Sequence, residues 1–500
     1  MFKMPLEWGS LPLLPLRCIL DHLSTEDALA ATSTCRHWRN SLLLYEGWKD
    51  ILVLRVGQLE KNLFLTRIFR KHTKKLLVYI DCVTELDKFL LIILPQFFDT
   101  ATLKELLFVG PRYVHHNQYS PIVKVNRVIV ESLVFKHSHC IRTLAFMGCE
   151  MGTMKSENER YTHKHVEYYS RPLSFSIRPS PTDTVLSRCN ADLMVFSTLK
   201  HILVDYEQIN TDTLETLSQL NNFTNLSLNI TRKKQFVLKP IDWQRLRERY
   251  PKGLDVAVNI ISLPHRKFVD VIENVLVEGL TLTSLKVMFC KNMYTPLLSH
   301  IVRLYQSTLR ELVWADSPYE ATDSYHRFLK HMSHTEPDTY NVNPFILLCW
   351  QCVHLQRLVI HGYWVWQYDL LGFVRLRKGL CQLEVSAIYR HQDAFKGDEP
   401  CEAEDVVRVL VGDHHAHAHH DFIDEVNLYT DFEWKPSPWS KLHPALRARS
   451  TPQQRADYII QEVRRPLGIT KRVNDRSSGY EYFNENIRDD VVFKLPTTKK

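Results

Sequence analysis

A histidine-rich run is the part of the sequence whose chemistry is easiest to name. Residues His414 to His420 read HHAHAHH and carry five imidazoles, and imidazole nitrogen is a common ligand of zinc and other transition metals. His415 and His419 are four positions apart, which would place them on one side of a helix. The run has no cysteine partner and no HExxH motif, and it follows the acidic segment GDEPCEAED. We therefore favour a solvated loop of low complexity and assign no metal site.

A second candidate for metal or redox chemistry is the pair Cys349 and Cys352, which is the one CxxC among eleven cysteines. A structural zinc site would need a second pair at a suitable spacing, and the sequence has none. Both cysteines flank Trp350 in an apolar run with helical character, where a buried thiol is the common case. An odd number of scattered cysteines is typical of reduced, intracellular thiols.

The usual catalytic signatures are absent. Neither the phosphate-binding GxxxxGK[ST] loop nor the GxSxG nucleophile elbow occurs, and 15 glycines are few for a nucleotide-binding α/β enzyme. We expect no cofactor and no catalysis by this chain, with an undetected active site as the alternative. The basic runs KHTKK from Lys71 and TRKK from Thr231 are typical of solvated faces, and the net charge of +7 is a weak bias. We expect no direct nucleic-acid binding.

Length and hydropathy place limits on the class of protein. A chain of 500 residues is too long for one compact core, so two or three units are expected. The N-terminus lacks the pattern of a secretory signal, and the longest apolar run, FLLIILPQFF from Phe89, contains Pro95 and is too short to span a bilayer. We expect a protein of the cytoplasm, the nucleus or both, with no membrane partner.

The first fifty residues predict a small helical module. Leu16, Ile19, Leu20 and Leu23 follow the i, i+3, i+4, i+7 spacing of one helical stripe. The segment STED from Ser24 is typical of a second helix start. A unit this short buries little of its own apolar surface and needs a partner surface, either in the same chain or on another protein.

The module also contains a fixed order of motifs: Leu11-Pro12, the stripe of Leu16, Ile19 and Leu23, then Asp27, Leu29, Cys35, the RHW that ends at Trp38, and Trp48. This order resembles the F-box family. The resemblance covers residues 8 to 51, and it departs from the family pattern at Pro15, Thr34 and Gly47. F-boxes bind the Skp-family adaptor of SCF-type cullin–RING ubiquitin ligases, which implies the adaptor and the cullin scaffold as partners. Carried over position by position, the adaptor-binding candidates are Leu11, Pro12, Leu16, Ile19, Leu20, Leu23, Leu29, Cys35, Trp38 and Trp48.

The middle of the chain contains an irregular repeat. Eight phrases share the pattern apolar-x-x-apolar-x-apolar, which is typical of the strand of a leucine-rich repeat; they begin at Thr102, Cys140, Thr198, Phe223, Leu282, Thr308, His354 and Gly379. Several phrases are 24 to 27 residues apart, as single repeats would be. The longest step leaves room for a further strand at LDVAVNI, from Leu254. Residues 151 to 183 are a candidate inserted loop.

These observations predict an α/β architecture in which a small helical F-box precedes an irregular leucine-rich-repeat-like solenoid, with helices such as LETLSQL and HIVRLYQSTL on its outer face. The expected division of the chain is an F-box at 1–55, a helical linker and the start of the repeats at 56–100, the substrate-recognition solenoid at 101–395, an acidic and histidine-rich insert with a C-terminal cap at 396–460, and a disordered tail at 461–500.

Alternation along a strand predicts which residues form the core. Leu355, Leu358 and Ile360 should point inward, and Trp314 is assigned to the core in the same way. Side chains of the opposite parity should line the open face of the strands. Together with two tryptophans after the strand end, the possible substrate face is Arg357, Val359, His361, Trp364 and Trp366.

Residues 343 to 371 are also similar to a segment found in an F-box protein that serves as a substrate receptor. Together, the F-box and the repeats predict the substrate-recognition subunit of an SCF-type ubiquitin ligase, which presents a target protein for ubiquitination and proteasomal degradation. The alternative is a protein-interaction scaffold that uses its F-box-like unit outside a ligase, with Thr34 and Gly47 as signs of weakened docking.

Overall fold

The structure is a computed structural model. It describes residues 8–23, most of 27–43, 51–98, 103–152, 198–230, 238–317, 343–389, 420–437, 442–447 and 450–465, with short gaps inside several of these ranges. The predicted insert at 151–183 lies outside the described residues apart from its first two positions. Four further predicted features also lie outside: Leu29, Trp48, Trp364 and His414 to His419.

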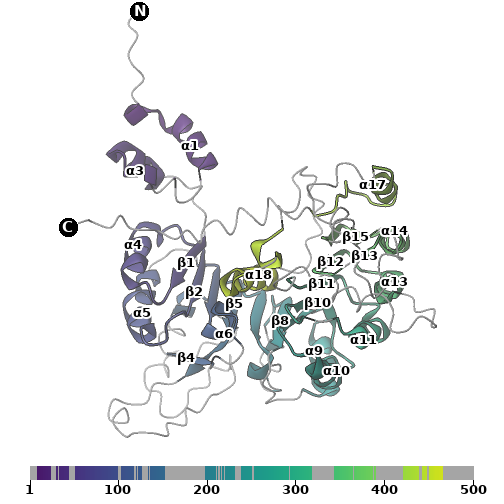
Figure 1. Cartoon of the computed structure of the whole chain (residues 1–500). Helices are drawn as coiled ribbons and strands as arrows, with labels where there is room; N and C mark the ends of the chain where they lie inside the picture. The colour runs from purple at the N-terminus through teal and green to yellow at the C-terminus, as the bar shows by residue number, and fades with distance from the viewer. Residues whose placement is uncertain are drawn as a thin grey trace, which may run out of the picture.

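The N-terminal residues form a small helical module that stands apart from the rest of the fold (Figure 1). It consists of the 3-10 turn η1 (Trp8–Ser10) and the helices α1 (Leu13–His22) and α3 (Arg36–Leu43). Pro12 directly precedes α1, and Pro15 lies in its first turn, where backbone N–H groups have no intrahelical partner to lose.

Beyond the module, the described residues build one long parallel sheet. Its eleven strands lie side by side in the order in which they occur along the chain, and every pairing between neighbours is parallel. The strands are β1 (Ile51–Arg55), β2 (Lys75–Tyr79), β3 (Glu105–Val109), β5 (Thr143–Met147), β7 (His201–Asp205), β8 (Asn225–Ile230), β9 (Asp255–Ile261), β10 (Leu282–Met288), β11 (Glu311–Ala315), β12 (Arg357–His361) and β14 (Gln382–Val385).

Two small parallel pairs accompany this sheet. Strand β4 (Val123–Asn126) pairs with β6 (Cys149–Gly152), and β13 (Val365–Trp366) pairs with β15 (Ile388–Tyr389). Each pair follows strands of the main sheet along the chain. The pairs extend the strand arrangement locally without joining the long sheet.

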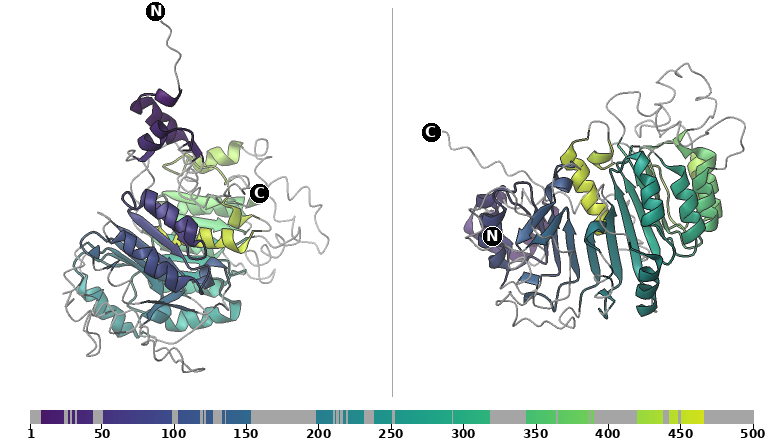
Figure 2. Two further views of the ribbon diagram at one scale, coloured as in Figure 1. Left: turned by 90° about the vertical axis from the view of Figure 1, so that its left-hand side faces the viewer. Right: turned by 90° about the horizontal axis from the view of Figure 1, so that it is seen from below.

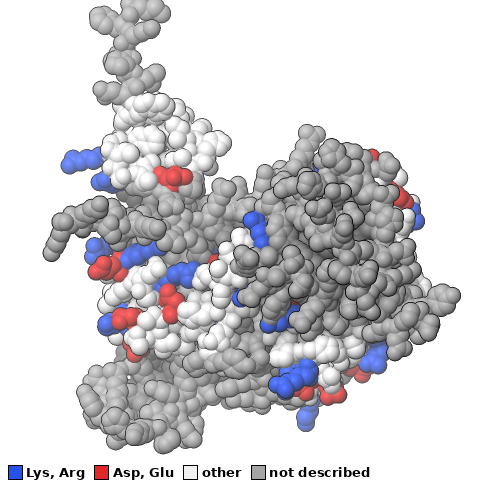
Figure 3. Space-filling model, viewed as in Figure 1, with Lys and Arg blue, Asp and Glu red and all other residues white. Residues whose placement is uncertain are grey.

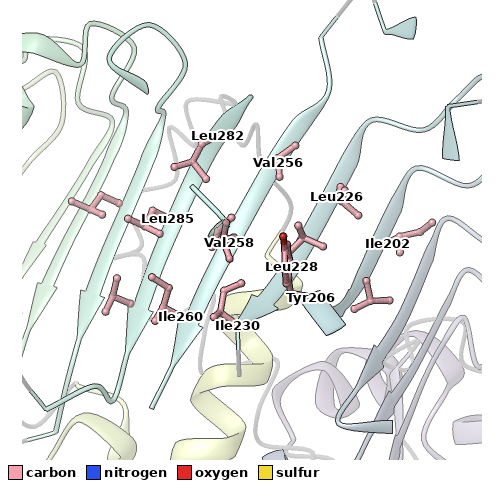
Figure 4. Close-up of a cluster of buried hydrophobic side chains, with 14 of the residues drawn as sticks. Ile202, Tyr206, Leu226, Leu228, Ile230, Val256, Val258, Ile260, Leu282 and Leu285 are labelled. Carbon is pink, nitrogen blue, oxygen red and sulfur yellow. The ribbon is translucent and has the colours of Figure 1, made fainter. Parts of the chain in front are cut away.

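Rows of aliphatic side chains hold the strands in register. Ile202, Leu226, Val256 and Leu282 stand opposite one another on successive strands, as do Leu228, Val258 and Leu285 on the next row (Figure 4). Both faces of these strands are buried, and their near-continuous apolar composition is typical of parallel sheets covered on both sides.

The eight repeated phrases all lie on strands of the sheet, and LDVAVNI forms β9, so these predictions are confirmed. The pattern did not reveal β1 and β2. The division at residue 55 places Ile51–Arg55 in the helical module, whereas this segment forms strand β1 of the sheet. The basic run from Arg67 to Lys75 is expected to be helical; its first residues belong to helix α4 (Leu59–Phe69), and its last residue, Lys75, begins β2.

Helices cover one face of the sheet. Their buried side chains join the inward-pointing strand residues, Trp314 and Leu358 among them, in one continuous core, as predicted. The helical elements are α4 (Leu59–Phe69), α5 (Leu86–Ile92), η2 (Leu94–Phe97), η5 (Tyr206–Gln208), α9 (Pro240–Arg249), η6 (His265–Lys267), α10 (Phe268–Asn274), α11 (Thr295–Tyr305), α13 (Pro344–Gln351), α14 (Gln367–Leu376) and α17 (His420–Asn427). HIVRLYQSTL supplies most of α11, as expected, whereas LETLSQL is described only in part.

The opposite face of the sheet is covered by the C-terminal part of the chain. Helix α18 (Pro452–Arg464), the turn η9 (Pro444–Leu446) and the short helix α6 (Pro111–Val114) form a second apolar core with the strands there. Figure 2 shows that the sheet is curved and that α18 lies in its hollow, away from the helices that cover the other face. Thr451 caps α18 through a reciprocal capping box with Gln454, which defines where the helix begins. The helix ends at Arg464, so the first four residues of the predicted disordered tail at 461–500 are helical.

Candidate functional site

The helical module has a very small core of its own. Leu16 and Leu20 of α1 are buried, and Leu23 and Trp38 pack against them. Burying a leucine side chain contributes about 1.5–3 kcal/mol, so two leucines give the module little stability. The apolar stripe predicted for α1 is therefore present in the structure. Its two central residues, Leu16 and Leu20, pack α1 against α3 and are not free to contact a partner.

Trp38 ties the three elements of the module together. Its indole N–H donates a hydrogen bond to the carbonyl oxygen of Trp8 at 2.8 Å. Beside it, a ring nitrogen of His37 lies 2.7 Å from the carbonyl oxygen of Leu11. These two contacts fix the segment before α1 against α3, so Trp38 is both a structural residue and part of the candidate surface.

The other predicted docking residues lie at or near the surface. Pro12 is exposed, and the remaining described members are half-buried: Leu11, Ile19, Leu23 and Cys35. They surround the buried pair of leucines and present partly accessible apolar side chains. The predicted set thus divides into an inner core and an outer surface.

The structure adds apolar residues that the sequence reasoning missed. Trp8 and Leu14 are each 72% exposed, and Leu13 is also accessible. Leu14 lies on the far side of α1 from Leu16, so it has no role in the core of the module. The sequence does contain a signal for this exposed surface, because Leu14 is apolar but lies outside the stripe of Leu16, Ile19, Leu20 and Leu23. The view in Figure 3 shows few charged side chains over the module, which fits a surface that binds a partner through apolar contacts.

The predicted substrate face is not open. Arg357, Val359 and His361 do point away from the helix-covered core, as alternation requires, but each is less than a tenth exposed. The C-terminal helix α18 packs over the concave face of the sheet and covers it. The prediction of an exposed face was therefore wrong for these three residues. Trp366 is half-buried at the start of α14.

Beneath α18 lies a buried cluster of charges that connects the helix to three strands. Arg357 of β12 contacts Glu311 of β11 at 2.5 Å and binds both carboxylate oxygens of Glu462 of α18 at 3.0 Å. Lys286 of β10 lies 3.5 Å from Glu311 and 3.7 Å from Glu462. Ser284 donates a hydrogen bond to Glu311 at 2.6 Å. We call Ser284, Lys286, Glu311, Arg357 and Glu462 the charge cluster.

The electrostatics of the charge cluster favour ionised carboxylates. Burial alone would raise the pKa of Glu462, but the nearby Arg357 and Lys286 outweigh this effect and lower the pKa to about 2. The pKa of Glu311 is lowered by the same two cations against the effect of burial. Because a buried charge is tolerated only when paired, each ion of the cluster depends on the oppositely charged side chains beside it.

The remaining candidates for chemistry give no catalytic arrangement. Cys349 and Cys352 are buried thiols whose pKa values are raised by burial, as expected for structural cysteines. Within the described ranges, no group of three or more His, Cys, Asp or Glu side chains is placed to hold a metal ion. None of the helices that the structure describes is long and apolar enough to cross a membrane.

Comparison with known proteins agrees with the geometry of the helical module. The model of the F-box domain family matches residues 8–50. In the F-box region, the chain is 48% identical over 40 residues to F-box only protein 33 from Homo sapiens and to the protein of the same name from Mus musculus. Each alignment covers 8% of this chain and 7% of the relative. The similarity thus concerns the helical module.

Proposed function

We propose that this chain, which carries an F-box domain at residues 8–50, is the substrate-recognition subunit of an SCF-type ubiquitin ligase. The F-box would dock the Skp-family adaptor and, through it, the cullin scaffold. The rest of the chain would hold a target protein for ubiquitination. F-box proteins are generally non-catalytic subunits, and we propose the same for this chain, with the ubiquitin-transfer chemistry on other subunits.

The observation that carries the adaptor-binding part is the exposed apolar surface of the F-box. Trp8 and Leu14 are large apolar side chains left in water by a module whose own core holds two leucines. Subunit contacts are usually built around such apolar and aromatic anchors. Burial of Leu14 against an adaptor would contribute about 1.5–3 kcal/mol.

We infer further that the sheet and its helices form an irregular leucine-rich-repeat-like solenoid that serves as the recognition unit. What supports this is the parallel order, along the chain, of the eleven strands in the main sheet, with helices on one face. Each repeat then contacts only its neighbours, which yields a long curved scaffold suited to binding another protein.

Co-purification from cells tests the proposal and separates it from the alternative of a non-ligase scaffold. We expect the adaptor and cullin to purify with the wild-type chain and to be lost from Leu14→Asp, which changes a side chain outside the module's core. The double variant Leu11→Ala, Trp38→Ala should also lose both, but it weakens the fold of the module as well, because Trp38 is bonded to Trp8.

A change elsewhere on the surface provides the control. Leu428 is 80% exposed at the end of α17, and Leu428→Asp should retain the adaptor and cullin. Adaptor without cullin on the wild-type chain, or neither of them, would contradict the ligase role and leave the scaffold as the better account.

A further inference from the structure

Side chains at the two ends of helix α18 and just beyond it reach strands at both ends of the sheet. Gln453 near its N-terminus accepts a hydrogen bond from Arg55 of β1 at 3.4 Å. At its C-terminus Arg464 reaches Glu105 of β3 at 3.3 Å. The adjoining Arg465 donates a hydrogen bond to Gln382 of β14 at 2.8 Å. Side chains of α18 and of Arg465, the residue that follows it, therefore contact the first and the last strand of the sheet.

The face that receives α18 has an apolar part. It consists of strand side chains such as Leu107, Leu203 and Val313, which are almost fully buried. The helix covers them with four apolar residues, Tyr458, Ile459, Ile460 and Val463. A contiguous apolar surface of this kind needs a cover, because soluble proteins rarely leave one open to water.

The same face has a charged part that differs from an ordinary core. The opposite face of the sheet is packed with apolar side chains, whereas here Lys286, Glu311 and Arg357 come from three neighbouring strands. These three residues pair with one another without help from α18: Glu311 lies 3.5 Å from Lys286 and 2.5 Å from Arg357. On the next strand, Glu384 lies 3.3 Å from a ring nitrogen of His361.

This pairing means that the sheet can lose α18 without leaving an unpaired buried charge. Charged side chains are almost never fully buried unless they are paired, and they are common on surfaces that meet water. The helix adds Glu462, which accepts two hydrogen bonds from Arg357. The face is therefore composed like a binding surface that selects an apolar helix with one carboxylate at a defined position.

We propose that the concave face is the target-binding surface and that α18 is its internal ligand. The partner is a protein segment that forms an amphipathic helix, with an apolar stripe matching Tyr458, Ile459, Ile460 and Val463 and a carboxylate in the place of Glu462. It binds by displacing α18. This inference rests on the proposed role in target recognition and names the class of target.

Competition within one chain sets the expected behaviour. A ligand tethered by a flexible segment acts at an effective concentration in the millimolar range. A free helix of equal intrinsic affinity is therefore excluded from the intact chain. The free helix should bind the concave face once the chain is cut before α18, with a gain in apparent affinity of about tenfold or more.

The experiment uses the full chain with a protease recognition sequence placed between Arg447 and Ser450. The probe is a fluorescent peptide with the sequence of residues 450–465, and its uptake is followed by anisotropy before and after cleavage. We expect the cleaved chain to exchange its own fragment for the peptide and the uncleaved chain to take up at least tenfold less.

Matched peptides test the recognition of the carboxylate. A Glu462→Lys peptide should bind at least tenfold more weakly than the parent, whereas a Glu462→Asp peptide, which keeps a carboxylate at that position, should bind more tightly than the Glu462→Lys peptide. A peptide of unrelated sequence that keeps the four apolar positions and Glu462 should also bind.

Three results would overturn the proposal. The cleaved fragment could remain bound without exchange, the cleaved chain could unfold when the fragment leaves, as circular dichroism would show, or the Glu462→Lys peptide could bind as tightly as the parent. Adaptor binding is measured on the same samples. Loss of adaptor binding with peptide exchange intact would count against the ligase role alone.

Discussion

Two arginine–glutamate pairs in this chain have the same separation and opposite surroundings, which makes them a direct test of how burial decides the strength of an ion pair. Arg357 and Glu311 are 2.5 Å apart with side chains 9% and 8% exposed. Arg375 and Glu425 are also 2.5 Å apart, with side chains 50% and 40% exposed. We predict that Arg357→Ala destabilises the chain far more than Arg375→Ala.

The magnitude follows from what each substitution leaves behind. Without Arg357, the buried carboxylates of Glu311, Glu384 and Glu462 remain with Lys286 and Arg465 to balance them. Removing one partner of a buried pair costs about 3–5 kcal/mol.

Removing Arg375 leaves a carboxylate in water. The loss there is below about 1 kcal/mol, with a similar small contribution from the stacking of Arg375 on Tyr429 at 4.9 Å. The two substitutions should therefore differ by at least about 1 kcal/mol.

Urea unfolding followed by circular dichroism measures both losses, provided that the slope of free energy against urea stays constant between variants. In the double variant Arg357→Ala, Glu462→Gln, the loss should be smaller than the sum of the single losses, because the two side chains share hydrogen bonds. Equal destabilisation by Arg357→Ala and Arg375→Ala would refute the reasoning.

Three further predictions concern acid stability, backbone geometry and the small core of the F-box. The pKa of Glu462 falls from 4.5 to about 2 on folding, so the stability it contributes is present above pH 4.5 and is lost as the pH falls toward 2. Glu462→Gln lacks this titration. In thermal melts between about pH 5 and about pH 3, the variant should therefore lose less stability than the wild type. Gly362 has a φ of +80°, and a Cβ there would lie 2.4 Å from the carbonyl oxygen of Asp316. Gly362→Ala should therefore lower the free energy of unfolding, measured by urea titration, by about 2 kcal/mol or more. Gly379→Ala is the control, because its Cβ would meet no atom within 4 Å and the free energy of unfolding should hardly change. Leu16→Ala should cost about 2–5 kcal/mol and increase hydrogen exchange in α1, whereas Leu14→Ala should leave exchange there unchanged.

The strands could be predicted because their apolar spacing is local. A residue such as Leu358 shows its inward direction through its neighbours Leu355 and Ile360, and the structure agrees. The same argument correctly gave the outward direction of Arg357. Strand β1 was missed because the helical module was extended to residue 55, and β2 was missed because it begins at the end of a basic run for which a helix was predicted.

What covers a strand face could not be predicted in this way. Glu462, which binds Arg357, is 105 residues further along the chain, and no local periodicity links the two. Alternation indicates the side on which a residue lies and leaves open what packs there. For the same reason the stripe of α1 identified a set of apolar residues but did not separate Leu16, which is buried, from the residues around it that are accessible.

Calorimetric titration of the purified full chain with a Skp-family adaptor tests the central claim most directly. The account predicts that the wild type and Leu428→Asp bind with the same affinity, and that Leu14→Asp binds about tenfold or more weakly. Absence of binding by the wild type, or unchanged affinity in Leu14→Asp, would contradict it.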